Sequence, residues 1–105
     1  MYRATTPTHT FKLNIETDQL KTILVTYKQG NTTLEKRYEN GTLPSGMTLS
    51  GKNVIVKLTQ EETLMFDERQ FARVQLRALS LAGDAYASQK FSLNVNGVFN
   101  EEILV

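Results

Sequence analysis

Apolar and polar residues alternate at every second position in several short stretches of this 105-residue chain. In the stretch 21–29, Ile23, Val25 and Tyr27 share one face of an extended strand. A period of two is typical of strands that bury one face and expose the other. The other residues that this pattern turns inward are Phe11, Leu13, Ile15, Met47, Leu49, Val54, Val56, Leu58, Val74, Leu76, Ala78, Phe91, Leu93 and Val95. The sequence therefore predicts an all-β domain.

A hairpin is predicted at Gly30 and Asn31, which lie between two of these stretches, because this pair suits a two-residue turn between antiparallel strands. The stretch 32–39 that follows is weaker, and it places Lys36 on the same face as apolar residues. Charged residues on a strand discourage pairing with other chains. We therefore predict an exposed or edge strand for this stretch.

A helix-start signal lies between two strand patterns. Thr59 is followed three residues later by Glu62, which is the spacing of a capping box. Polar residues come soon after it, and strand alternation resumes by Phe71, so there is room for only one or two helical turns. We expect Leu64 and Phe66 to be buried, and the link to carry the chain from one sheet to another over the end of a sandwich.

These elements amount to six or seven short strands with frequent turn signals. That pattern favours an all-β fold of the immunoglobulin-like type, an antiparallel β-sandwich with one short helical crossover. The chain contains no Cys and no Trp, so the usual landmarks of antibody domains are missing and only the architecture is predicted. We expect a single domain over residues 1–105, in which residues 97–105 form an apolar C-terminal tail.

Composition excludes several classes of function. Without Cys, disulfide frameworks and thiolate metal sites are excluded. The net charge is +1, with 12 basic and 11 acidic residues, whereas nucleic-acid binders usually have a clear basic excess. No stretch approaches the roughly 20 apolar residues of a membrane helix or looks like a signal peptide. We therefore expect no nucleic acid and no membrane among the partners, and synthesis in the cytoplasm.

No catalytic motif stands out. His9 is the only histidine, it has Thr on both sides, and we interpret it as a solvated or edge residue. A zinc site needs three or four ligands, which one His makes improbable. Four carboxylates surround the predicted helix start, where the helix dipole favours them; a calcium site there lacks the usual ligand spacing. These are Glu61, Glu62, Asp67 and Glu68. We expect neither enzymatic activity nor a cofactor.

A basic stripe is formed by Arg73 and Arg77, which share one face of a predicted strand. Such a row is usually solvated or paired with acids on the neighbouring strand. It could also contact phosphate, a partner's carboxylate or sugar hydroxyls. Together with Tyr2, Tyr38 and Tyr86, if these are exposed, the stripe leaves open an alternative role as a carbohydrate-binding module.

The tail is unusually apolar for the end of a domain, where residues are commonly polar and poorly ordered unless docked. Its apolar residues are Val98, Phe99, Ile103, Leu104 and Val105. The tail either folds back on its own sandwich or inserts into a partner or a second copy by strand addition. Together with exposed edge strands, it makes a homodimer plausible.

Three segments carry a resemblance: "YRATTPTHTFKLNI", "GKNVIVKLTQEETLMF" and "VQLRALSLAGDAYASQKFSLNVNGVFNEEIL". Their distinctive motifs are "TTPTHTF", "LTQEET" and "VQLR" followed by the Ala-Ser exit from the later turn. In these motifs the chain resembles a family of small proteins encoded among virion structural genes of phages and prophages of Gram-positive bacteria. The opening is also similar to the N-terminal immunoglobulin-like domain of phage baseplate upper proteins.

The resemblance implies a non-catalytic, virion-associated accessory role, with phage tail or baseplate proteins or the chain itself as partners. It implies location in the host cytoplasm during assembly and in the virion afterwards. No catalytic or ligand residues are carried over from the family. The candidate partner-binding residues are those of the basic stripe and the apolar tail, and the alternative remains a carbohydrate-binding β-sandwich that aids host attachment.

Overall fold

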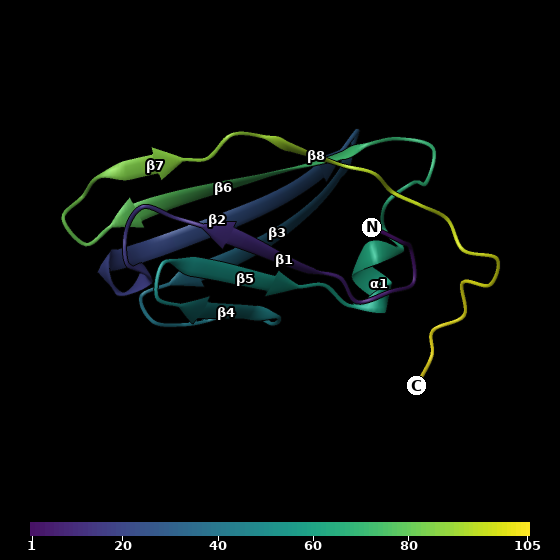
Figure 1. Cartoon of the computed structure of the whole chain (residues 1–105), viewed down its shortest axis with the longest axis horizontal. Helices are drawn as coiled ribbons and strands as arrows, with labels where there is room; N and C mark the ends of the chain where they lie inside the picture. Colours follow the sequence, from purple (N-terminus) through teal and green to yellow (C-terminus); the bar gives the residue numbers. More distant parts are fainter.

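Two antiparallel sheets pack face to face in the computed structural model, which describes all residues from 1 to 105 (Figure 1). The first sheet has the order β1-β5-β4, with bounds Thr8–Lys12, Asn53–Lys57 and Met47–Ser50. The second has the order β3-β2-β6-β7, with β8 also pairing with β6. Its strands are Thr32–Glu39, Leu20–Gln29, Ala72–Ser80, Ala85–Ala87 and Phe91–Leu93 for β3, β2, β6, β7 and β8. The helices are η1 (Thr17–Gln19) and α1 (Gln60–Thr63), and neither is long enough to cross a bilayer.

The strand order confirms the predicted immunoglobulin-like sandwich. In that fold one sheet carries strands A-B-E-D and the other carries C-F-G, to which variable-type domains add C′. Here β1-β5-β4 corresponds to B-E-D, and β3-β2-β6-β7 corresponds to C′-C-F-G. No named strand takes the place of strand A. In the N-terminal segment only Tyr2 pairs with another segment, through an isolated parallel bridge to Asn96.

Alternation along the strands builds the core as predicted. The inward residues of β2, which are Ile23, Val25 and Tyr27, are fully buried. In an antibody domain strand C carries a buried Trp; here the buried aromatic of that strand is Tyr27. Its ring lies 6.4 Å from the ring of Phe66 and 5.5 Å from that of His9, centroid to centroid.

The predicted capping box and crossover are confirmed. The amide of Glu62 donates to Oγ1 of Thr59 at 3.1 Å, and the amide of Thr59 donates to Oε1 of Glu62 at 2.9 Å. The single turn of α1 carries the chain from β5 in one sheet to β6 in the other. Phe66 is fully buried as expected, but Leu64 is only half-buried. Thr63 is the residue of α1 that points into the core, where its hydroxyl bonds to the backbone of Thr5.

The predicted edge strand is confirmed, because β3 lies at the edge of its sheet. Its Lys36 points inward, and the ammonium binds Oε2 of Glu62 at 2.5 Å and the carbonyl of Ser45 at 3.0 Å. Burial alone would raise the pKa of Glu62, but hydrogen bonds from Lys36 and Thr59 outweigh it and lower the pKa. An inward charge on an edge strand also discourages pairing with another chain.

The last predicted strand differs from the structure, which has eight strands instead of six or seven. Pairing with β6 is split between β7 and β8, and two residues of β6 face three residues between these strands. Such an extra residue is a β-bulge. At this point the hydroxyl of Ser88 accepts the amide proton of Leu76 at 2.9 Å, in place of a regular ladder bond. Val95 is buried as predicted but lies beyond the strand.

Candidate functional site

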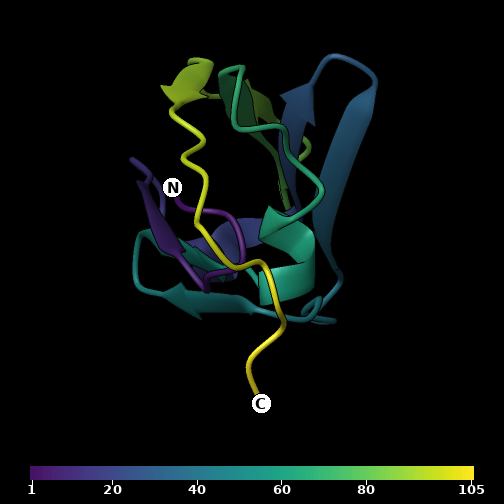
Figure 2. The same ribbon diagram turned by 90° about the vertical axis from the view of Figure 1, so that its right-hand side faces the viewer.

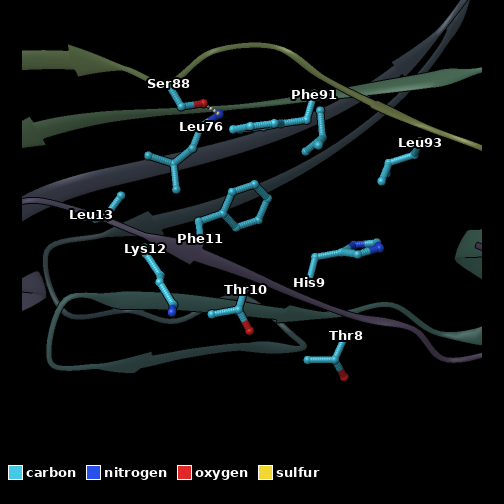
Figure 3. A pocket seen from close by; sticks show the side chains of 11 residues that line it. Thr8, His9, Thr10, Phe11, Lys12, Leu13, Leu76, Ser88, Phe91 and Leu93 are labelled. Atoms are coloured by element: carbon cyan, nitrogen blue, oxygen red, sulfur yellow. Dashed lines mark hydrogen bonds between the residues drawn. The ribbon is translucent and has the colours of Figure 1, made fainter.

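A groove of about 570 Å³ separates β1 from β8 (Figure 3). The two strands belong to different sheets, and each lies at the edge of its sheet. Figure 3 shows side chains from β1, β6 and β8 converging on the groove. The main apolar ones are Phe11, Leu13, Val74, Leu76, Phe91 and Leu93. An apolar hollow between two free sheet edges is a site where an extended peptide can be added as a strand.

The chain covers only one end of this side of the sandwich. The ammonium of Met1 donates to the carbonyl of Asn94 at 2.5 Å, and the amide of Asn96 donates to the carbonyl of Met1 at 2.8 Å. The amide of Arg3 then donates to the carbonyl of Asn96 at 2.9 Å. Ala4 turns the chain back toward β1 with a positive φ of 59°. The edges of β1 and β8 therefore remain open beyond residues 1–3.

His9 lies on β1, and its side chain is part of the groove lining. The interpretation of His9 as an edge residue is correct, but it is not a freely solvated side chain, because Nδ1 lies 2.7 Å from the hydroxyl oxygen of Tyr27. Burial and the nearby ammonium of Met1 lower the pKa of His9. Burial and the charge of Glu62 raise the pKa of Tyr27. At neutral pH Tyr27 therefore keeps its proton and His9 is neutral, and one hydrogen bond joins the hydroxyl to Nδ1.

The four carboxylates near α1 have structural partners or face solvent. Glu62 is engaged by Lys36 and by the helix cap. Asp67 accepts hydrogen bonds from the side chain and amide of Arg69, which lower its pKa to about 2. Glu61 and Glu68 are exposed. No group of three or more His, Asp or Glu side chains gathers where it could hold a metal ion.

The basic stripe lies on the outer face of the five-stranded sheet. Arg73 and Arg77 point away from the core, and neither forms an ion pair. Their neighbours on β2 are Lys28 and Leu24, so no acid stands directly opposite either arginine on that strand. The stripe is therefore solvated, and it does not belong to the groove.

The three tyrosines of the carbohydrate-binding alternative are not brought together. Tyr38 lies on β3 and packs against the core, whereas Tyr86 lies on β7 at the other edge of the same sheet. Tyr2 lies beside Asn96, at the α1 end. These tyrosines do not form a common stacking platform for a sugar.

The tail crosses the α1 end of the sandwich and has no regular secondary structure (Figure 2). The side-chain amide of Gln60 pairs with the backbone of Leu104 through two hydrogen bonds of 2.8 Å. Glu101 forms an ion pair with Arg3. Phe99 and Val105 are nevertheless fully exposed, and Leu104 is 71% exposed. The tail is held by polar contacts, while most of its apolar surface faces solvent.

Alternation did not reveal the groove, because it assigns a residue to a face and says nothing about which edge strands are missing. The bulge was also missed, although the polar interruption from Ser88 to Lys90 was a signal for it. Candidate residues of the tail and of the basic stripe lie on separate surfaces.

A scan against protein-family models and a search of curated proteins found no match to this chain.

Proposed function

We propose that this protein is a non-catalytic structural and protein-interaction module of a phage or prophage tail or baseplate. The phage context rests on the resemblance of the three segments described above. One observation supports an interaction role: Gln60 bonds to the backbone of Leu104 and Arg3 pairs with the carboxylate of Glu101, while Phe99, Leu104 and Val105 face solvent.

The tail shares the α1 end with other exposed apolar side chains. Tyr2 is 57% exposed and Met65 is 45% exposed. We call the set Tyr2, Met65, Phe99, Leu104 and Val105 the α1-end surface. Large exposed apolar groups gathered on one face mark sites of protein association.

The test is to locate the protein in particles. Virions from an induced lysogen that carries an epitope-tagged copy are purified and separated into capsid, tail and baseplate fractions. We expect the tagged chain in the tail or baseplate fraction at a fixed stoichiometry. Its absence from virions and from every tail intermediate would overturn the proposal.

A matched pair of variants connects the surface to assembly. Leu104→Ser removes an exposed apolar side chain of the tail, whereas Leu81→Ser removes one from the turn at the opposite end of β6. We expect the first to reduce recovery of the chain in tail fractions and the second to leave it unchanged, with equal melting temperatures. A glycan array on the purified protein covers the carbohydrate-binding alternative, and specific glycan binding without virion incorporation would favour that role instead.

A further inference from the structure

The groove lies where an immunoglobulin-like sandwich carries strand A, which pairs with strand B. Strand B corresponds to β1, whose only partner is β5. Residues 1–3 enter this region only at the α1 end (Figure 1). The remaining edge of β1 faces the groove, so one strand added there would complete the four-stranded sheet.

The backbone of β1 has free hydrogen-bonding groups for such a strand. The amide of Leu13 donates to the carbonyl of Lys52 at 2.8 Å, and the amide of Leu58 donates to the carbonyl of Pro7 at 3.0 Å. Odd-numbered residues of this segment therefore bond to β5. Because neighbouring residues in an antiparallel strand point their N–H and C=O groups to opposite sides, those of Thr8, Thr10 and Lys12 point to the free edge.

The side chains around the groove favour an apolar strand. Phe91 pairs with inward-facing Val74, so it stands on the inner face of its sheet, yet it is 46% exposed. A strand added along β1 would send every second side chain over Phe91, Leu93 and Leu76 (Figure 3). Leu76 is already buried, so the gain comes from covering Phe91 and Leu93, at roughly 25 cal/mol for each Å² of apolar surface removed from water.

We propose that residues 98–105 of a second copy occupy this groove as an added strand along β1. This inference rests on the interaction function proposed above and names the partner. Phe99, Ile103 and Val105 fall on one face of the extended segment, with Glu101 as the only polar residue among them. Eight extended residues span roughly 26 Å, which exceeds the roughly 17 Å of the five-residue β1.

Charge and geometry both favour a second copy. Lys12 on β1 and Lys90 next to β8 are exposed and form no ion pair, whereas the segment carries Glu101 and Glu102. Within one molecule the segment leaves β8 at the α1 end and runs away from the groove (Figures 1 and 2). Exchange breaks the exposed contacts made by Gln60 and Arg3, and exposed ion pairs contribute little to stability.

The first test blocks the groove with proline. Thr10→Pro removes a backbone N–H that points to the groove and leaves the bonds between β1 and β5 in place. Thr33→Pro is the matched control on the outer edge of β3. Its N–H also points away from the sheet, since Asn40 bonds to Lys21 and fixes the alternation of that strand.

We expect light scattering after size exclusion to find the full chain associated, Thr10→Pro monomeric and Thr33→Pro associated as in the wild type. A labelled peptide of residues 97–105 should bind the Thr10→Pro chain at least tenfold more weakly than the Thr33→Pro chain. Thermal melting checks that both variants are folded. A monomeric wild type that does not bind the peptide would overturn the inference, and so would equal peptide binding by the two variants.

The second test separates donor from acceptor. The double variant Phe99→Ser, Val105→Ser disables the segment and leaves the groove intact, so it should be monomeric and still bind the peptide. Mixed with Thr10→Pro, which retains its own segment, it should form a one-to-one pair. Failure of the mixture to pair, or equal binding of a scrambled peptide, would overturn the choice of occupant. Virion incorporation would then still support the proposed function.

Discussion

On one side of the sandwich, where β3 lies near the segment leading into β4, the buried ammonium of Lys36 joins Glu62 and the carbonyl of Ser45. On the other side no hydrogen bond or ion pair joins β1 to β8, and a groove remains between them. Both sides present edge strands, which invite pairing with other chains. The closed side uses an inward charge that pairs within the molecule, whereas the open side leaves its backbone groups for another strand.

The largest effect is expected from Glu62→Ala, which removes the ion pair with Lys36 on the closed side of the sandwich. This change leaves the ammonium of Lys36 buried without its carboxylate and also removes half of the capping box. We expect the free energy of unfolding to fall by about 3 kcal/mol, measured by urea denaturation at pH 7. Glu61→Ala is the matched control in the same helix, with an expected change within about 0.5 kcal/mol. Similar losses in both variants would contradict a joining role for Lys36.

Lowering the pH should also reduce the free energy of unfolding through Glu62, but by less than the Glu62→Ala substitution. The pKa of Glu62 is lowered from its ordinary value of 4.5, so its contribution is fully present above that value and is lost as pH falls through the lowered pKa. We expect stability to decline below about pH 4.5, by less than the loss caused by Glu62→Ala. In the double variant Lys36→Met, Glu62→Gln, stability at pH 7 should be largely kept and this acid dependence should be weaker. An unchanged pH profile in the double variant would contradict the assignment.

A smaller effect is expected where the core meets the open groove. Tyr27→Phe removes the hydroxyl that is hydrogen-bonded to Nδ1 of His9. We expect a loss of about 1 kcal/mol in the free energy of unfolding, because the half-buried ring nitrogen of His9 loses its hydrogen-bond partner. Tyr38→Phe is the control, since its hydroxyl makes no hydrogen bond to the protein, and it should change stability by less than about 0.5 kcal/mol. The two variants should be compared by thermal and urea unfolding.

The smallest effect is expected on the outer face of the five-stranded sheet, which belongs to neither side. Arg77→Ala removes an exposed cation with no ion-pair partner. We expect a change within about 0.5 kcal/mol in urea denaturation, together with unchanged association in light scattering. A loss of association in this variant would move the interaction surface from the groove to the basic stripe.

Much of the fold was predictable from local pattern. The inward faces of β2, β5 and β6, the hairpin at Gly30 and the capping box at Thr59 all follow from side-chain periodicity or from turn and cap chemistry. These features depend on residues within a few positions of each other. The pairing of Glu62 with Lys36 joins the helix α1 to the strand β3, which are distant in the sequence, so neither residue's sequence neighbours reveal it.

The last strand marks the limit of this reasoning. Phe91 and Leu93 were placed on the inner face, and their pairing with β6 agrees with that. The bulge at Ser88 and the missing strand A leave Phe91 nearly half exposed, although its place in the pattern is that of a core residue. Alternation predicts which way a side chain points, but exposure depends on what lies opposite it.

The amino-acid sequence alone therefore determined the strand periodicity, the turns, the helix cap and the apolar character of residues 97–105, because each arises from local backbone preference and side-chain type. Only the tertiary structure decided which edges stay open, where Lys36 finds its carboxylate and how the tail is held by Gln60. Those outcomes depend on contacts between residues distant in sequence, which form only when the two sheets pack together.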